Sequence, residues 1–287
     1  MERAHPAAEH FAQELGLPPY RPTAFPSLRE ASVGDSAVPR LELVQWAERY
    51  GVVAGITTRG GRGAGAGAGA GADTRAFSLG LWSEDNVGQV MTRWRAFRAA
   101  FGRAFPMTIT SNQVHGTLVE WQEAALDGWL ILDGVDGHAT AQPGILLTIT
   151  VADCIPVYLA VPRKGAMALL HAGWRGTVGR VLERGVEILK RQAFAKAADI
   201  VMHCGVGICG ACYEVGPEVA VQFSGMIEQS PRSLDLREVL ARAAELGIPD
   251  VSISPWCTAH DRERFLSHRA SGGREGRMVA YLGRPAA

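Results

Sequence analysis

The chain has 287 residues, of which 47% are hydrophobic, and its 29 acidic side chains balance 29 basic ones. This length suits one large globular domain or two small ones, and the balanced charge gives no sign of a nucleic-acid or membrane surface. No apolar stretch approaches the roughly 20 residues that cross a bilayer. The N-terminal residues also lack the apolar centre of a signal peptide, so we expect a cytoplasmic protein.

Two segments have biased composition. The first 40 residues are rich in proline, alanine and charge and show no sustained periodicity, which predicts a loosely ordered N-terminal extension. The Gly/Ala-rich stretch at 60–75 offers no side chains to bury, so we expect a mobile surface loop there.

Apolar spacing predicts a mixture of helices and strands in the rest of the chain. In chain order we expect a helix at 41–50, a strand at 52–58, a helix at 87–101, strands at 107–111, 117–121 and 129–132, a turn-rich loop at 133–140, strands at 145–151 and 166–170, a helix at 178–189, a strand at 199–203, a helix at 236–246 and a last strand near the C-terminus. Asp85 or Asn86 is expected to cap the second helix, and Thr177 the third. Because the elements do not alternate regularly as βαβ units, an α+β fold with mixed β-sheets is favoured over a doubly wound fold.

The stretch from 145 to 176 carries the side chains around which the other motifs gather. Cys154 follows one predicted buried strand and His171 follows the next, and buried strands hold their ends rigidly. Gly173 and Gly176 leave room for backbone or ligand to come close. The thiol and the imidazole can therefore converge.

His115 stands at a predicted turn, so three metal-binding side chains, His115, Cys154 and His171, fall at strand ends or turns. Two imidazoles and a thiolate suit Zn²⁺ and leave the fourth tetrahedral position for water or substrate, as in catalytic sites. Zinc-bound water with a pKa of about 7 is a nucleophile suited to a purine-like ring. Spacing alone gives equal weight to an interpretation without a metal. In it, His115 is a turn histidine, Cys154 a small core residue and His171 a strand-end residue.

The same residues support two other hypotheses. Cys154 can be a nucleophile with His171 or His115 as its base, in a metal-free amidase or acyl transferase. A second histidine favours the metal, because a Cys–His dyad needs only one. A zinc-stabilised interaction module without catalytic activity is the third hypothesis, and sequence separation leaves all three open.

The odd number of cysteines favours metal binding or catalysis over disulfides. Cys209 and Cys212 form a CxxC pair which, with Cys204 and Cys257, suggests a structural four-cysteine zinc site. Because such sites normally offer two CxxC pairs, we favour buried thiols along a Gly-rich turn. Glu214, beside this turn, is either a general acid or base or a solvated turn residue.

Arg59, Arg175 and Arg269 each stand beside Gly, Ser or His in a predicted loop. Together they could clamp an anion such as phosphate, because guanidinium groups match oxyanions. Any one arginine alone is more often a surface residue, but Arg175 follows His171 closely and is expected to face the same cleft. Asp136 is predicted either to orient a ligand histidine or to make an Asx turn.

Seven motifs within residues 50–283 resemble the laccase-domain family, also described as the YfiH-type or polyphenol-oxidase-like purine nucleoside phosphorylase family. In chain order they are GITTRGG, NQVHG, VDGHAT, TVADCIPVYL, LLHAGWRGTV, GICGACYEVG and SHRASGGREGRMVAYL. The combination of QVHG, ADC and HAGWRG is specific to that family.

The resemblance implies a single YfiH-like domain over residues 41–287, with outer helices on mixed sheets, and a zinc ion bound by His115, Cys154 and His171. It implies phosphorolysis of adenosine, inosine or methylthioadenosine, and adenosine deamination. The family is also linked to an older claim of copper-dependent phenol oxidation, and some bacterial members to hydrolysis that corrects misbuilt peptidoglycan precursors.

This sequence departs from the family pattern in the enlarged loop after Arg59, at Ala270, where a basic residue commonly follows SHR, and in its long N-terminal extension. A multicopper oxidase needs several clustered coppers bound mainly by imidazole, whereas this chain has eight histidines, two of them, His5 and His10, in the extension. We therefore expect a zinc-dependent purine nucleoside enzyme whose partners are a nucleoside and phosphate. A Cys–His amidase acting on peptidoglycan precursors and a polyphenol oxidase are the alternatives.

Overall fold

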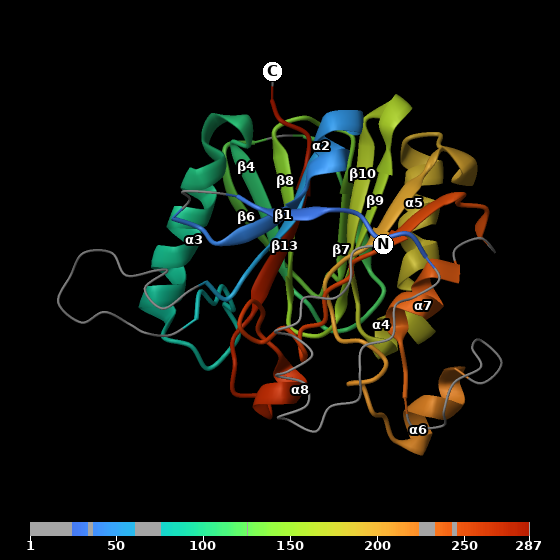
Figure 1. The fold of residues 1–287 in the computed structure, drawn as a ribbon. Helices are drawn as coiled ribbons and strands as arrows, with labels where there is room; N and C mark the ends of the chain where they lie inside the picture. The colour runs from blue at the N-terminus through green and yellow to red at the C-terminus, as the bar shows by residue number, and fades with distance from the viewer. Residues whose placement is uncertain are drawn as a thin grey trace.

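The structure, a computed structural model, describes residues 25–33, 37–60, 76–124, 126–223, 233–242 and 246–286. Two β-sheets pack face to face, and a long helix covers the outer face of each, which gives four layers (Figure 1). The first sheet contains, in spatial order, β1 (Glu30–Ser32), β2 (Arg40–Leu43), β3 (Val53–Thr57), β13 (Met278–Gly283), β8 (Ile145–Val151), β4 (Met107–Asn112) and β6 (Gly128–Asp133). The second contains β12 (Asp250–Ile253), β11 (Val201–Cys204), β9 (Ile155–Val161), β10 (Ala166–Ala172), β7 (Gly137–Thr140) and β5 (Val119–Gln122).

Both sheets mix parallel and antiparallel pairs. Strand β4 runs parallel to β6 and β8, whereas β13 is antiparallel to β3 and β8. In the second sheet, β9–β10 is antiparallel and β11–β12 is parallel. The mixed-sheet α+β fold is therefore confirmed.

Side-chain alternation along the central strands builds three layers of core. On β8, Ile145, Leu147 and Ile149 face the space between the sheets, while Leu146 packs under α3 (Val87–Phe101). On β10, Leu169 faces the first sheet and Leu170 packs under α5 (Val181–Gln192). Both faces of these strands are buried, which explains their nearly continuous apolar sequences. The other helices are α2 (Val44–Tyr50), α4 (Trp174–Val178), α6 (Pro217–Ala220), α7 (Leu236–Ala241) and α8 (His268–Ser271).

The predicted helix at 87–101 is confirmed together with its cap, because Asn86 Oδ1 accepts a hydrogen bond from the Gln89 N–H at 3.1 Å. The strands predicted at 52–58, 107–111, 117–121, 129–132, 145–151, 166–170 and 199–203 all have counterparts. None of the described helices is long and apolar enough to cross a membrane.

Three local predictions were wrong. Residues 41–50 divide between β2 and α2, and the loop predicted at 133–140 contains β7. Thr177 lies inside α4 and donates its hydroxyl to the Gly173 carbonyl, whereas α5 begins after Arg180, which has a φ of 72°. Strand β9 was missed because a short, continuous apolar run has no period that separates strand from helix.

Parts of the predicted extension and loop lie outside the described residues. Within the predicted extension, β1 pairs with β2, and the Pro26 carbonyl accepts a hydrogen bond from the N–H of Ile253. Residues 1–24, 34–36, 61–75 and 243–245 are not among those described. The last of these ranges falls in the helix predicted at 236–246, of which α7 covers 236–241.

Tyr158 on β9 joins the two sheets by donating its hydroxyl to the Gly55 carbonyl on β3 at 2.8 Å. Replacing Tyr158 with Phe leaves that carbonyl without this donor in the core, so we expect the free energy of unfolding to fall by about 1–2 kcal/mol in urea titrations. Tyr50→Phe is the matched control, because the Tyr50 hydroxyl lies at the surface, 3.5 Å from Asp250 Oδ2. Equal losses in the two variants would contradict a special role for Tyr158.

Candidate active site

Three side chains meet where the two sheets end. One ligand atom from each of His115, Cys154 and His171 lies within 4.8 Å of the others, and the two imidazole centroids are 4.9 Å apart. His115 comes from the loop between β4 and β5, Cys154 from the turn between β8 and β9, and His171 from the end of β10. The first sheet and the second sheet thus both position this group.

The Asp136 carboxylate orients His171. Its Oδ1 lies 2.8 Å from His171 Nδ1, and both side chains are almost fully buried. A carboxylate on one ring nitrogen favours the tautomer whose other nitrogen, Nε2, is free to bind a metal. Of the two interpretations of Asp136, the structure matches the one in which it orients a histidine, namely His171.

The same carboxylate also shapes the turn that carries His115. Asp136 accepts hydrogen bonds from the backbone N–H groups of Val114, His115 and Gly116, at 3.2, 3.0 and 2.7 Å. His115 has a φ of 60°, a left-handed conformation that costs energy for a residue other than glycine. Three N–H groups on one buried carboxylate hold the turn in this conformation.

Opposite charges shift the pKa values in this group. Burial alone would raise the pKa of Cys154, but the charge of His171 and hydrogen bonds from both histidines lower it to about 6. Burial opposes protonation of His171, yet the Cys154 thiolate and Asp136 raise its pKa to about 9. Burial likewise opposes ionisation of Asp136, and hydrogen bonds from His171 and Gly116 lower its pKa. Both shifts favour a thiolate on Cys154 and an imidazolium on His171 at neutral pH when no metal is bound.

Two glycines make room for the group. A Cβ atom on Gly173 would lie 3.0 Å from His115 Cδ2 and 3.1 Å from Cys154 Sγ. A Cβ atom on Gly176 would lie 3.0 Å from the Gly116 carbonyl oxygen. The close approach predicted for both positions is confirmed.

Asp153, directly before Cys154, connects the site to distant loops. Its φ is 86°, and its carboxylate accepts hydrogen bonds from the Thr258 hydroxyl and the Arg269 N–H, both at 2.6 Å. Its carbonyl accepts a hydrogen bond from the Ile208 N–H at 2.9 Å. The position of Cys154 therefore depends on contacts from three separate segments.

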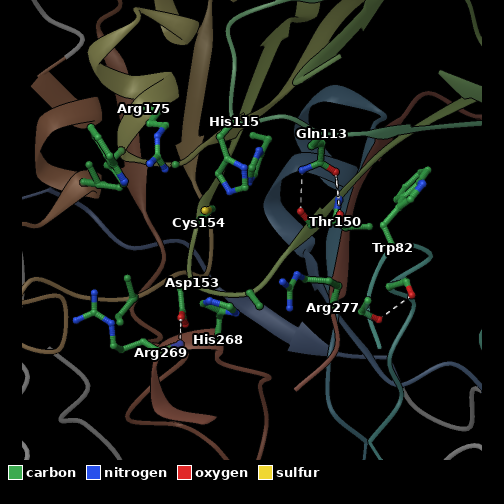
Figure 2. A pocket seen from close by; sticks show the side chains of 18 of the residues that line it. Trp82, Gln113, His115, Thr150, Asp153, Cys154, Arg175, His268, Arg269 and Arg277 are labelled. Carbon is green, nitrogen blue, oxygen red and sulfur yellow. Dashed lines mark hydrogen bonds between the residues drawn. The ribbon is translucent and has the colours of Figure 1, made fainter. Parts of the chain in front are cut away.

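The group lines a cavity of about 480 Å³, a size typical of small-molecule sites. Arg175 and Arg269 both line it, and Figure 2 shows them on opposite sides of Cys154. Arg175 lies with its guanidinium 4.4 Å from the centre of the Trp174 ring, and Arg269 stacks on Tyr213 at 5.0 Å. No carboxylate of the described residues forms a salt bridge with these two arginines.

Two of the predicted candidates lie elsewhere. Arg59 is not among the lining residues; its guanidinium pairs with Glu275 and donates to the Phe265 carbonyl at 3.3 Å. Glu214 is exposed and is not among the lining residues, and its carbonyl accepts a hydrogen bond from Arg269 Nη1 at 2.7 Å.

The structure adds lining residues that were not singled out from the sequence, namely Trp82, Gln113, His268 and Arg277. Gln113 joins the His115 loop to β8 through both Thr150 backbone groups, at 2.8 and 2.7 Å. Gln113, His268 and Arg277 lie within the quoted motifs NQVHG and SHRASGGREGR, which could have indicated them. Trp82 lies outside every motif.

Comparison with known proteins agrees with this fold. The family model described as multi-copper polyphenol oxidoreductase laccase matches residues 53–285, and the chain belongs to that family. The purine nucleoside phosphorylase YlmD of Geobacillus stearothermophilus is 32% identical over 82% of this chain and 90% of its own. The crystal structure of YlmD from that organism superposes with a TM-score of 0.77, covering 90% of this chain and all of that one at 28% identity.

Two further relatives differ in their named activities. A purine nucleoside phosphorylase of Deinococcus radiodurans is 39% identical over 65% of this chain and 74% of its own length. Adenosine deaminase RL5, from an unidentified prokaryote, is 34% identical over 57% of this chain and 65% of its own. The chain therefore resembles enzymes named for two reactions of purine nucleosides.

Replacing Asp136 with Asn tests its role as the common acceptor. One amide oxygen cannot accept all four hydrogen bonds, and the amide NH₂ opposes the donors that face it. We expect the affinity of the His115, Cys154 and His171 group for Zn²⁺, measured by competition with a chromophoric chelator, to fall about 10–100-fold. Asp133→Asn is the control, because the Asp133 side chain is exposed and accepts a hydrogen bond from the Asn112 amide at 2.8 Å; a similar loss in both variants would refute the assignment.

The lowered pKa of Cys154 predicts how the thiol reacts in chelator-treated protein. Because the thiolate is the reactive form, alkylation by iodoacetamide should increase through a midpoint near pH 6 and level off above about pH 7. Mass spectrometry of the modified peptide measures the rate. In His171→Gln the midpoint should move to higher pH, because the positive charge is lost; an unchanged midpoint would contradict the proposed pairing.

Proposed function

We propose that this protein is a zinc-dependent purine nucleoside enzyme that catalyses phosphorolysis of adenosine, inosine or methylthioadenosine, and deamination of adenosine. The observation that carries the proposal is the group of His115, Cys154 and His171 at one wall of a cavity that also contains Arg175 and Arg269, which form no salt bridge with a carboxylate of the described residues. The two activities named for its relatives support the same substrate class.

The donor atoms fit zinc. Two imidazoles and a thiolate are borderline and soft ligands, and three protein donors leave a tetrahedral position open toward the cavity. Asp136 already bonds to Nδ1 of His171, so Nε2 is the atom expected to bind the metal. When bound, zinc polarises a water or substrate atom and lowers the pKa of bound water to about 7.

The arginines supply the charge for a phosphate. Arg175, Arg269 and Arg277 line one cavity, and Asp153 is the acidic residue that lies among them. Burial raises the pKa of Asp153, and its carboxylate is engaged by Thr258 and Arg269, so it adds little negative field. Guanidinium groups bind phosphate through paired N–H donors, so we assign Arg175 and Arg269 to phosphate binding.

The aromatic lining suits a flat base. Trp82, Trp174 and Tyr213 border the cavity, and Trp82 is half exposed. Purine rings stack on such faces, with the ribose directed toward the polar groups. His115, Cys154 and His171 orient the reacting atom, while Arg175 and Arg269 hold the anion beside it. The five free cysteines fit a reducing compartment, so we place the enzyme in the cytoplasm.

A Cys–His amidase is the second candidate, because one specific observation favours it. The pKa of Cys154 is lowered to about 6 beside His171, as in cysteine nucleophiles paired with histidine. A polyphenol oxidase is less favoured. The described residues contain two groups of potential metal ligands. One has two histidines and the other has one, whereas a multicopper centre needs clustered coppers bound mainly by imidazole.

The proposal is tested by incubating the untagged protein with adenosine, with and without phosphate. Adenine with ribose 1-phosphate indicates phosphorolysis, and inosine indicates deamination. Cys154→Ala should lose the zinc ion bound by His115, Cys154 and His171, together with the turnover. In Arg175→Ala, the KM for phosphate should increase by at least about tenfold, since a charge-assisted contact contributes about 1.5–3 kcal/mol.

Arg184→Ala is the matched control, because Arg184 is exposed on α5 and pairs with Glu187. Unchanged nucleoside turnover in Cys154→Ala would end the proposal. Chelator-treated protein that stays active on a peptide amide, and that iodoacetamide inactivates at Cys154, would replace it with the amidase.

A further inference from the structure

A second group of metal-type side chains lies outside the cavity just described. Cys209, Cys212, Cys257 and His260 each offer a ligand atom within 4.8 Å of the others. Three of the four are almost fully buried, and Cys212 is half-buried. All three cysteines are free thiols.

The separations are close to those of a tetrahedral site. His260 Nδ1 lies 3.4 Å from Cys209 Sγ and 3.2 Å from Cys212 Sγ. With Zn–S bonds of about 2.3 Å and Zn–N bonds of about 2.0–2.1 Å, sulfur and nitrogen ligands stand roughly 3.6 Å apart. These two sulfur–nitrogen distances are therefore within a few tenths of an ångström of those in a loaded site.

Two short turns present the four ligands. The Cys212 N–H donates to the Cys209 carbonyl at 3.0 Å, which closes the first turn. In the second, the Cys257 N–H donates to Asp261 Oδ2 and the Asp261 N–H donates to the Cys257 carbonyl, both at 2.9 Å. The turns are joined where the Cys209 N–H points to Cys257 Sγ at 3.3 Å, a contact that stabilises a thiolate.

We propose that Cys209, Cys212, Cys257 and His260 bind a second, structural zinc ion. The pattern Cys-x₂-Cys followed by Cys-x₂-His supplies three thiolates and one imidazole, so the protein fills every tetrahedral position. This site differs from the four-cysteine site considered from the sequence. Cys204 lies in β11 and packs in the core, and the fourth ligand is His260 instead. The inference holds whatever reaction the other site catalyses.

The position of this group explains what such an ion would do. Ile208, next to Cys209, donates its N–H to the Asp153 carbonyl, and Thr258, next to Cys257, donates its hydroxyl to the Asp153 carboxylate. Asp153 directly precedes Cys154. An ion that locks the two turns together therefore holds Asp153 in its left-handed conformation, and through it the thiol of the first site.

The test uses Cys154→Ala, which removes a ligand of the first site, as untagged full-length protein dialysed against a weak chelator to strip loosely held metal. We expect one zinc per chain by elemental analysis. X-ray absorption should give about three sulfur neighbours at about 2.3 Å and one nitrogen neighbour. This measurement identifies the ligand atoms directly, and all four residues of the proposed site remain unaltered.

Variants in the same background then locate the ion. Cys257→Ser and His260→Ala should carry no zinc, whereas His260→Cys should keep one, because four thiolates also bind zinc tetrahedrally. Cys204→Ala is the matched control and should keep one. Chelation should lower the melting temperature of Cys154→Ala protein, because a metal bound only by the folded state stabilises it.

Folded Cys154→Ala protein that holds no zinc, with all four remaining thiols titratable, would overturn the proposal. Zinc that persists in the variant carrying both Cys154→Ala and Cys257→Ser would overturn it as well. A sulfur count near one would show that the ion is held elsewhere and would have the same effect.

Discussion

A single buried carboxylate, Asp136, connects the elements that form the candidate active site. It accepts three backbone N–H groups from the turn of His115 and binds Nδ1 of His171. A buried carboxylate is stable only when several donors compensate for its desolvation, so the charge and its donors require one another. The left-handed conformation of His115 and the tautomer of His171 both follow from this one arrangement.

The two sheets supply the rigidity that this arrangement needs. Strands β8 and β10 are buried on both faces, and each ends beside a residue of the His₂Cys group. Hydrophobic packing is non-directional and cannot by itself place a thiol within a few ångströms of two imidazoles. Directional contacts do so at the strand ends, through Asp136 on one side and Asp153 on the other.

Two groups of soft ligands share Asp153 as a neighbour but differ in their chemistry. The His₂Cys group faces a cavity and provides three donors, which leaves room for a reacting molecule. The Cys₃His group is mostly buried and provides four, which suits a structural ion. Arg175 and Arg269 line the cavity of the first group, so they add positive charge on the side where a small molecule can enter.

The sequence by itself determined the elements with strong periodicity and the candidate ligands. The helix at 87–101 and the strands at 145–151 and 166–170 follow from local apolar patterns, because burial on one or two faces leaves a period in the sequence. His115, Cys154 and His171 could be identified as candidate ligands because each has a metal-binding side chain at a predicted strand end or turn, within a recognisable motif. Only the tertiary structure decided that Arg59 pairs with Glu275 instead of lining the cavity, and that His260 joins three cysteines. Such contacts link residues that are far apart in the chain, and no local pattern records a distance that only the packing of two sheets creates.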